Sequence, residues 1–372
     1  MKAFSAILCL VLVSGAFANN AAAQSWSSNG PLPRLVESMV YDSSSHRIII
    51  FGGGSTDLTS SFQGLNDVWR LYGSPNPLGG TGLNWNQVHA VGTPPAPRGG
   101  HSAGYDPTSN RMIVFGGQIG QTTCANDLWV LTNANGFGGN AAWNQLFFSG
   151  GPPAAREEQG GVYDAASNTL MIFGGDNCNN GAFSDVWVLS NANGVSGTPT
   201  WTQLSPAPGP QARRSFGTVY DPVSNELIIF GGYNDSGGYF NDVWVLSNAN
   251  GTGGAPVWTQ LSPTGTLPGV RANLSVIYDP ASNHMTLFGG IVSNTLYNDV
   301  WVLTNANGRG GTPAWMQITP SSNILPQPRA GHRAVYNASS NVMTVFGGVL
   351  TPPPPPELVT GDVFMLSHAN GQ

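Results

Sequence analysis

Residues 213–261 read RRSFGTVYDPVSNELIIFGGYNDSGGYFNDVWVLSNANGTGGAPVWTQL, and this stretch decides the fold. It contains four short apolar-leaning segments, at 215–220, 226–230, 242–246 and 258–261. Turn sequences separate them, among them Asp-Pro-Val-Ser-Asn and Asn-Ala-Asn-Gly, whose residues favour tight turns and tolerate positive φ. No segment shows the 3.6-residue period of a helix. The stretch therefore predicts four short antiparallel strands.

The same frame occurs six times in the chain. In each copy an arginine is followed after 7 residues by a tyrosine and after 17 residues by Phe-Gly-Gly. The arginines are 64, 58, 57, 58 and 58 residues apart. The repeated residues are Arg34, Arg98, Arg156, Arg213, Arg271 and Arg329, then Tyr41, Tyr105, Tyr163, Tyr220, Tyr278 and Tyr336, then Phe51, Phe115, Phe173, Phe230, Phe288 and Phe346. One four-stranded unit copied six times predicts an all-β, six-bladed β-propeller.

The repeated Arg, Tyr-Asp, Phe-Gly-Gly, Asp-Val-Trp and Trp-x-Gln over residues 26–372 resemble the kelch repeat family, within the galactose-oxidase-like propeller superfamily. The resemblance implies four strands per blade, A to D, running from a central channel outward. It also implies that the D–A and B–C loops open on one face of the ring, which we name the D–A/B–C face. Galactose-oxidase-like copper chemistry is not expected, because no separate ligand-bearing domain follows the repeats.

The outer strands indicate how the ring closes. Five copies carry a tryptophan after strand C, whereas the sixth ends at Gln372 without one. Trp26 and the residues up to Arg34 are similar to a strand D and its exit. We therefore predict that the strand around Trp26 pairs with residues 362–366 and completes the last blade, which removes two free sheet edges.

Residues 1–23 have the features of a secretory signal peptide: Lys2, the short apolar run at 6–13 and the small residues at 21–23. The residue before Cys9 is Leu8 rather than a small one, so lipoprotein anchoring is not expected. We predict a single propeller domain over residues 24–372, exported to the periplasm or the extracellular space and monomeric.

Charge is scarce: 9% of residues are charged, and Lys2 is the only lysine. Fifty glycines and 28 prolines agree with short strands and many turns. The formal net charge of −6 and the lack of a basic cluster argue against nucleic acid or an anionic membrane as partner. The chain has no Gly-x-Ser-x-Gly, no phosphate-binding loop and no metal-spaced His/Cys cluster, so we expect no cofactor and no metal.

The loops on the D–A/B–C face vary between copies. The interval from the repeated phenylalanine to the following aspartate, which contains the B–C loop, is 16, 12, 12, 12, 11 and 16 residues long. The turns expected on the opposite face are nearly identical from copy to copy. A uniform face and a diversified face are typical of a recognition scaffold, although drift in unconstrained loops would give a similar pattern.

Carboxylates that do not recur in the repeat gather in the same loops. Eleven of 19 acids recur in register, and we assign them to turns and blade linkage. Seven of the other eight fall in D–A or B–C segments: Glu37, Asp57, Glu157, Glu158, Asp176, Asp235 and Glu357. The six repeated arginines and Arg214 are expected on this face too. Two roles remain open for the repeated arginines: bonding carbonyl groups of the neighbouring blade, or binding an anionic ligand.

The position three residues after each repeated arginine is occupied by Glu37, His101 and His332 in copies one, two and six, which are neighbours in a closed ring. Two imidazoles beside a carboxylate could bind a metal or perform acid–base chemistry. The alternative is a structural role, because the resembled family commonly has histidine at this position.

Cys124 and Cys178 remain after removal of the signal. Both lie in B–C loops of adjacent blades, and export supplies an oxidising environment. We predict that they form a disulfide.

The leading hypothesis is a non-catalytic module that binds a glycan or a protein through the D–A/B–C face. The alternative is a carbohydrate-active enzyme, epimerase- or lyase-like, that uses Glu157, Glu158 or Glu37 with nearby arginines. A third hypothesis is a structural module of an extracellular assembly. A deep polar pocket with convergent acids and arginines would favour the enzyme. Exposed aromatic residues in the loops, namely Phe62, Tyr233, Tyr239 and Phe240, would favour binding. The candidate ligand contacts are Arg34, Glu37, Arg98, His101, Arg156, Glu157, Glu158, Arg213, Arg214, Arg271, Arg329 and His332.

Overall fold

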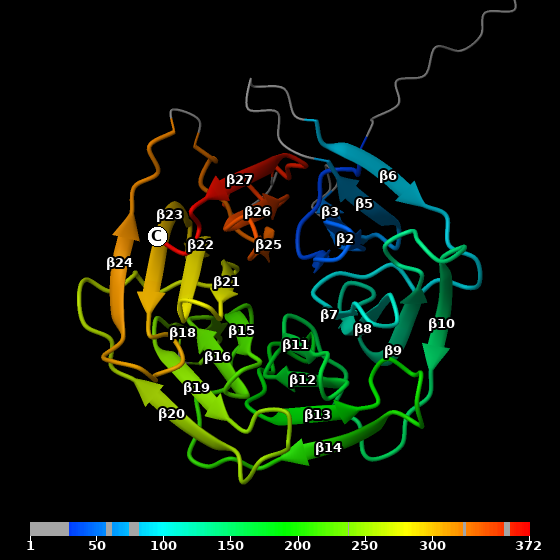
Figure 1. Cartoon of the computed structure of the whole chain (residues 1–372), viewed down its shortest axis with the longest axis horizontal. Coiled ribbons are helices and arrows are strands. Elements are labelled where there is room, and N and C mark those ends of the chain that lie inside the picture. Colours follow the sequence, from blue (N-terminus) through cyan, green and yellow to red (C-terminus); the bar gives the residue numbers. More distant parts are fainter. Residues whose placement is uncertain (1–29, 57–61, 74–81, 237, 323–324, 353–357) are drawn as a thin grey trace, which may run out of the picture.

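The computed structural model describes residues 30–56, 62–73, 82–236, 238–322, 325–352 and 358–372. Six antiparallel sheets are arranged radially around one axis, in chain order, with the innermost strands around a central channel (Figure 1). The described residues form strands and no helix. The predicted six-bladed β-propeller is confirmed. Within the described part of the chain, no helix is long and apolar enough to cross a membrane.

The first three blades each contain four strands in the order A, B, C and D. Blade 1 consists of β1 (Ser38–Asp42), β2 (Arg47–Phe51), β5 (Val68–Tyr72) and β6 (Asn84–Val88). Blade 2 consists of β7 (Ser102–Asp106), β8 (Arg111–Gln118), β9 (Cys124–Thr132) and β10 (Ala142–Leu146). Blade 3 consists of β11 (Gly160–Asp164), β12 (Thr169–Phe173), β13 (Val186–Ser190) and β14 (Thr200–Leu204).

The last three blades follow the same plan. Blade 4 consists of β15 (Gly217–Asp221), β16 (Glu226–Phe230), β19 (Val243–Ser247) and β20 (Val257–Leu261). Blade 5 consists of β21 (Ser275–Asp279), β22 (His284–Val292), β23 (Thr295–Thr304) and β24 (Ala314–Ile318). Blade 6 shows β25 (Arg333–Asn337), β26 (Val342–Phe346) and β27 (Val363–Ser367). Short two-stranded ribbons, β3 (Gly54–Thr56) with β4 (Phe62–Gly64) and β17 (Tyr233–Asn234) with β18 (Gly238–Tyr239), lie in the B–C loops of blades 1 and 4.

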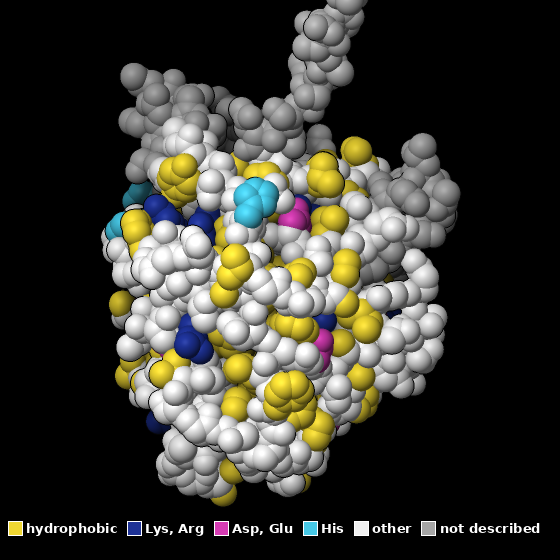
Figure 2. Space-filling view, turned by 90° about the vertical axis from the view of Figure 1, so that its right-hand side faces the viewer, with side chains coloured by type: hydrophobic (Ala, Val, Ile, Leu, Met, Phe, Trp, Pro, Cys, Tyr) yellow, Lys and Arg dark blue, Asp and Glu magenta, His cyan; other side chains and the backbone are white. Residues whose placement is uncertain are grey.

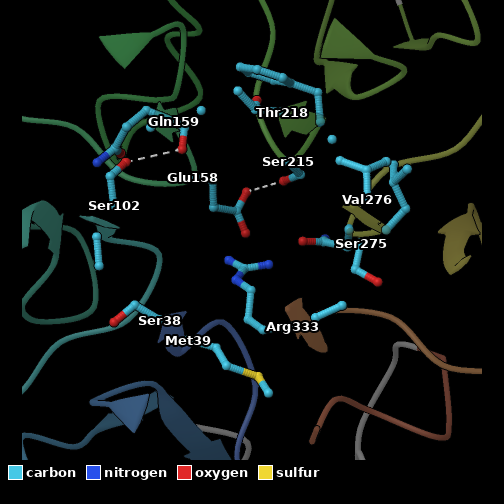
Figure 3. A pocket seen from close by; sticks show the side chains of 18 of the residues that line it. Ser38, Met39, Ser102, Glu158, Gln159, Ser215, Thr218, Ser275, Val276 and Arg333 are labelled. Atoms are coloured by element: carbon cyan, nitrogen blue, oxygen red, sulfur yellow. Dashed lines mark hydrogen bonds between the residues drawn. The ribbon is translucent and has the colours of Figure 1, made fainter. Parts of the chain in front are cut away.

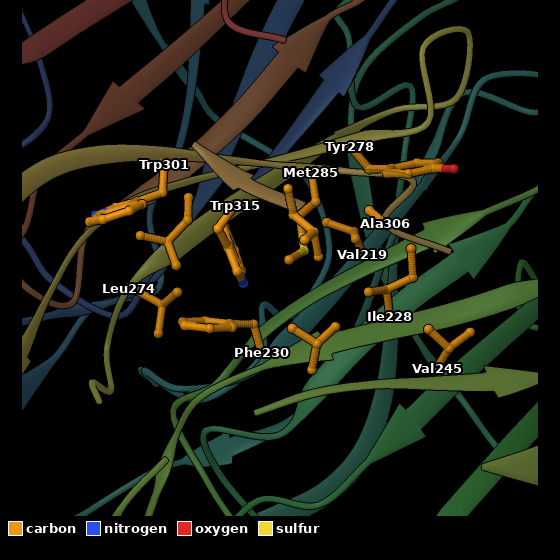
Figure 4. Close-up of a cluster of buried hydrophobic side chains, with 13 residues drawn as sticks. Val219, Ile228, Phe230, Val245, Leu274, Tyr278, Met285, Trp301, Ala306 and Trp315 are labelled. Carbon is orange, nitrogen blue, oxygen red and sulfur yellow. The ribbon is translucent and has the colours of Figure 1, made fainter. Parts of the chain in front are cut away.

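The hydrophobic core lies between neighbouring blades. Strand B is covered on both sides, so all five residues of β12 and of β16 are buried. The repeated phenylalanine of one blade contacts the outer-strand tryptophan of the next, as in the Phe230–Trp315 pair, whose ring centroids are 5.2 Å apart (Figure 4). The same contact joins Phe51 to Trp143 at 4.8 Å. These aromatic pairs explain why both residues recur in the sequence.

Repeated polar contacts join the blades on the face opposite the D–A/B–C loops. In five blades the aspartate after the tyrosine accepts a hydrogen bond from the last asparagine of the next blade's Asn-Ala-Asn turn, which reads His-Ala-Asn in blade 6. An example is Asn193 Nδ2 to Asp106 Oδ2 at 2.7 Å. Equivalent bonds are Asn135–Asp42, Asn250–Asp164, Asn307–Asp221 and Asn370–Asp279. The turns on this face are nearly identical from copy to copy because they make the hydrogen bonds that join neighbouring blades.

Blades 1 and 6 are adjacent, so the ring is closed. The backbone N–H of Arg34 donates to the carbonyl of Thr360 at 3.2 Å, and that of Gly348 donates to the carbonyl of Arg34 at 2.8 Å. Trp85 of blade 1 packs on Phe346 of blade 6, with centroids 5.3 Å apart. The predicted closing strand around Trp26 lies outside the described residues.

Candidate functional site: the channel mouth

The six repeated arginines are buried inside the blades, each at most 1% exposed. Each guanidinium forms a two-pronged ion pair with the aspartate that begins strand C of its own blade. In blade 2, Arg98 Nη1 and Nη2 lie 2.6 and 2.9 Å from Asp127 Oδ1 and Oδ2. The other pairs are Arg34–Asp67, Arg156–Asp185, Arg213–Asp242, Arg271–Asp299 and Arg329–Asp362.

The remaining donors of these arginines are also used. Arg98 Nη1 donates to the carbonyl of Gly116 and Nε to that of Ala96, both within the same chain segment that builds blade 2. The carbonyl partners therefore belong to the arginine's own blade. From the sequence, carbonyl groups of the neighbouring blade had been considered instead. The structure places none of the six guanidinium groups at the channel mouth, because burial and the aspartate saturate them. We do not retain Arg34, Arg98, Arg156, Arg213, Arg271 or Arg329 as ligand contacts.

Glu37, His101 and His332 lie at three different blade junctions and do not converge. His101 Nε2 is 2.8 Å from Ser38 Oγ of the preceding blade, and His332 Nε2 is 2.9 Å from Ser275 Oγ in the same way. Burial, together with nearby arginines, lowers the pKa of His101 well below its usual value and that of His332 to about 3. Both imidazoles are therefore neutral packing residues.

Glu37 occupies the equivalent socket between blades 6 and 1. It is fully buried, and neither carboxylate oxygen has a hydrogen-bond partner in the described part of the chain. Burial raises its pKa to about 7, against the opposing charges of Arg333 and Arg34. Of the two roles left open for Glu37, His101 and His332, the structure does not assemble the metal or acid–base group.

A closed ring of six backbone hydrogen bonds forms the rim of the channel. The residue two positions after each arginine has a left-handed φ, between 51° and 68°. Its N–H donates to the carbonyl of the equivalent residue in the preceding blade, at 2.7–3.0 Å. The six residues are Val36, Gly100, Glu158, Ser215, Asn273 and Gly331. The ring fixes where Glu158 and Ser215 stand, since their backbones cannot rotate without breaking it.

The channel has three successive sections. An outer basin of about 370 Å³ is lined by Glu158, Arg214, Ser215, Tyr233, Tyr239 and Asn273, among others. An inner pocket of about 180 Å³ shares three of these residues and adds Gln159, Thr218 and Arg333 (Figure 3). A wider section of about 630 Å³ continues to the opposite face and is lined by the six repeated tyrosines. A ligand arriving at the D–A/B–C face reaches the inner pocket through the basin.

The corner between blades 3 and 4 concentrates charge around Arg214. Arg214 lies 3.7 Å from Asp176 and 3.7 Å from Asp235, and Ser215 donates a hydrogen bond to Glu158. Asp176 is fully buried, and its oxygens have no hydrogen-bond partner among the described residues. Burial and the charges of Glu158 and Asp176 raise the pKa of Glu157 to about 8. The structure therefore brings Glu157, Glu158 and Arg214 together, while Asp57 and Glu357 lie outside the described residues.

The sequence interpretation missed Arg333, whose side chain enters the inner pocket. Arg333 stands four residues after the repeated arginine, and the other copies have Ser38, Ser102, Gly160, Gly217 and Ser275 there. Its Nε donates to the carbonyl of Glu37 at 2.9 Å. Arg333 could have been recognised as a candidate site residue, because every other copy has serine or glycine at this position.

Two of the four expected aromatic residues line the basin. Tyr233 and Tyr239 face each other across the β17–β18 ribbon, with ring centroids 4.8 Å apart. Phe240 packs against Arg213, whose guanidinium carbon lies 4.1 Å from the ring centroid, so it belongs to the blade interior. The side chain of Phe62 lies outside the described part of the structure. The side of the ring seen in Figure 2 carries only scattered charged groups and no basic patch.

Cys124 and Cys178 form a disulfide that links the B–C segments of blades 2 and 3, with Cα atoms 5.7 Å apart. The sulfur atoms lie beside Glu157 in the single cluster of metal-ligating side chains found among the described residues. The disulfide form offers no thiolates to a metal.

We expect no free thiol at Cys124 or Cys178 in residues 24–372, purified without reductant and then denatured. Thiol alkylation followed by intact mass measurement checks this, with a reduced sample as the positive control for two modifiable cysteines. Two alkylated thiols without reductant would contradict the bond.

The matching family model is the KLHDC2/KLHL20/DRC7 Kelch-repeats domain, over residues 80–208, 136–246 and 165–370. These matches cover more than half of the chain, which therefore belongs to the kelch-repeat family. The family and the fold are those of a protein-interaction module.

Similar curated proteins include Kelch repeat-containing protein 2 of Saccharomyces cerevisiae, 28% identical over 58% of this chain and 24% of the yeast protein. The F-box/kelch-repeat protein At1g51550 of Arabidopsis thaliana is 24% identical over 87% of this chain and 68% of the plant protein. The matched region spans 24–37% of the length of several curated relatives. A solved structure described as "Structure of YjhT" has a TM-score of 0.59 over 91% of this chain and 96% of that chain at 14% identity, which supports the fold alone.

Proposed function

We propose that this protein is an exported, non-catalytic binding module that recognises a glycan or an extracellular protein at the channel mouth on its D–A/B–C face. The observation that carries the proposal is the difference between the two faces. The opposite face is occupied by the repeated Asp–Asn interblade contacts, whereas the basin gathers groups that no other blade repeats: Glu158, Arg214 and the Tyr233–Tyr239 pair.

The basin offers the contacts that a polar ligand needs. Arg214 and Glu158 provide a charged donor and a charged acceptor, and the two tyrosines provide apolar surface with hydroxyl groups at the edge. Ser215 and Asn273 add uncharged hydrogen-bonding groups. A concave site of a few hundred Å³ with convergent polar groups is the usual form of a ligand site.

We expect Arg214→Ala and Glu158→Ala to abolish or strongly weaken binding while the protein stays folded. Neither residue recurs in the repeat, so neither is required by every blade. Glycan arrays and purified extracellular proteins supply the candidate ligands, and a thermal melt of each variant checks folding. Val223→Ala is the matched control, because Val223 is 84% exposed on a turn of blade 4 at the opposite face. Unchanged affinity in both basin variants, or lost affinity in the control, would refute the assignment of the face.

The enzyme alternative has one observation in its favour. Glu158 and Arg333 converge in the inner pocket, and the pKa of Glu157 near 8 would keep a proton available at neutral pH. However, Glu157 lines neither the basin nor the inner pocket, and Glu37 is sealed between blades. A single acid in reach lacks the second group that sugar epimerisation or elimination requires. Turnover of hexoses or hexuronic acids, followed by NMR and lost in Glu158→Gln, would establish the enzyme instead.

A further inference from the structure

We propose that the inner pocket of the channel binds a small zwitterion of the α-amino-acid type, with its carboxylate at Arg333 and its ammonium group at Glu158. This inference names a ligand class for the deeper part of the mouth, and it rests on the proposed function only in using the same entrance. The pocket is enclosed by the innermost strands of the blades and by the rim of backbone hydrogen bonds.

The two charged groups stand on opposite sides of the channel. Glu158 belongs to blade 3 and Arg333 to blade 6, three blades apart in a ring of six, and their side chains point toward each other across the pocket (Figure 3). No ion pair joins them, and none is formed by Arg333 with any described residue. Both groups enter the same pocket without an ion pair between them, so each is available to a ligand that carries the two complementary charges.

Arg333 keeps donors available for an anion. Its Nε donates to the carbonyl of Glu37 at 2.9 Å, and Nη1 lies 3.5 Å from the carbonyl of His332. Both contacts hold the side chain in the channel, and Nη2 has no acceptor within the described part of the chain. A planar carboxylate is the ligand that a guanidinium edge binds best.

The remainder of the wall contains unused hydrogen-bonding atoms beside apolar residues such as Phe216 and Val276. Gln159 is 8% exposed, and its Oε1 has no partner among the described residues; Thr218 Oγ1 is likewise buried without one. Unpartnered buried groups such as these two are costly unless water or a ligand satisfies them. Ser38, Ser102 and Ser275 also line the pocket, but their hydroxyl groups already have hydrogen-bond partners in the chain.

The volume sets the size of the guest. About 180 Å³ corresponds to roughly six water molecules at the volume each occupies in the liquid. A small amino acid such as glycine, alanine or serine fits in this section with room for water, whereas a disaccharide is too large for this section alone. The size and the two facing charges together favour a small zwitterion over a singly charged ion.

The repeat itself supplies test variants that preserve the fold. Arg333→Ser introduces the residue that copies one, two and five have at this position, and Glu158→Ser introduces the residue of copy four at the left-handed rim position. Isothermal titration of the mature protein with glycine, L-alanine and L-serine measures binding. Acetate and methylammonium at equal ionic strength serve as single-charge probes, and Val223→Ser is the control on the opposite face.

We expect saturable binding of at least one amino acid, weakened roughly 10-fold to 100-fold in each pocket variant because each loses a charge-assisted hydrogen bond. Acetate and methylammonium should bind at least about 10-fold more weakly than the zwitterion, and Val223→Ser should behave as the parent. The inference is overturned if no zwitterion binds, if acetate binds as well as glycine, or if Arg333→Ser binds as the parent does. Arg214→Ala separates the two proposals, since it should remove binding of the larger ligand at the basin and leave amino-acid binding in place.

Discussion

Arg98→Ala is expected to lower the free energy of unfolding by about 3–5 kcal/mol, the range found when one member of a buried ion pair is removed. Arg98 is 1% exposed and donates to both oxygens of Asp127 and to the carbonyl groups of Gly116 and Ala96. Burial alone would raise the pKa of Asp127, but the hydrogen bonds and charge of Arg98 hold it below its usual value. Removing the arginine leaves two carbonyl groups without their donor, and it leaves the Asp127 carboxylate with the indole N–H of Trp129 as its remaining side-chain donor. Urea unfolding followed by tryptophan fluorescence measures the loss.

A double-mutant cycle isolates the ion pair from the rest of the side chain. Asp127→Ala alone leaves the buried guanidinium unpaired, whereas the double variant removes both charges. The double variant should therefore be less destabilised than the sum of the two single variants. Arg98→Lys should recover only part of the stability, since an ammonium group cannot make the two-pronged contact. A loss under about 1 kcal/mol in Arg98→Ala would show that the repeated arginine is not a structural centre of its blade.

The fold could be predicted from the sequence because the same contacts, within a blade and between adjacent blades, are repeated around the ring. The aspartate and arginine of one blade pair within that blade, and the phenylalanine and tryptophan pair with the next blade, so all four recur in the same order. The phenylalanine always follows the arginine by 17 residues. A residue that every copy needs is visible without any knowledge of the structure. The same logic explains the error in assigning the repeated arginines to a ligand: a group needed in all six blades is used by the blade itself.

The site was predicted only in part, because its residues are the ones that break the repeat. Glu158 and Arg214 were found because a charge appeared where the other copies have uncharged residues, with Glu157 at the position of Arg214 as the one exception. Arg333 was missed, although the other copies have serine or glycine at its position. The neighbouring His332 was considered as the functional residue instead. Glu158 of blade 3 and Arg333 of blade 6 enter the same pocket only because the ring is closed, and their separation in the sequence gives no indication of this.

The junction between blades 6 and 1 shows that one buried position between blades accepts different residue types. The residue three positions after the repeated arginine of one blade packs against the preceding blade. There it contacts the residue four positions after that preceding blade's own arginine. The pairs are His332 with Ser275, His101 with Ser38, Phe216 with Gly160, Leu274 with Gly217, and Glu37 at the junction with blade 6, which carries Arg333. Glu37 is the one member of this set that can carry a negative charge, and it is fully buried.

Glu37→Gln is expected to stabilise the protein by about 3 kcal/mol at pH 8 and by under about 1 kcal/mol at pH 5. Burial raises the pKa of the native carboxyl to about 7 from an ordinary value of 4.5. Between these values the native state holds a proton that the unfolded state has released, so stability falls as the pH rises through this window. Above pH 7 the cost is fully present, and it equals the pKa difference multiplied by about 1.4 kcal/mol. Below pH 4.5 both states are protonated and the cost vanishes.

The substituted amide has a precedent in the same fold. Gln159 occupies the equivalent socket in copy three, where its Nε2 donates to the carbonyl of Phe115 at 3.2 Å, and the carbonyl of Phe346 stands at the corresponding place beside Glu37. Unfolding of the parent and of Glu37→Gln, followed from pH 5 to pH 8, gives the difference directly. Adding Arg333→Ser to the parent should raise the pKa of Glu37 further, because that guanidinium is the largest opposing charge, and the stabilisation by Glu37→Gln at pH 8 should grow. An equal effect of Glu37→Gln at both pH values would mean that the buried carboxyl is compensated in the native state, and that the ring closes without an electrostatic cost.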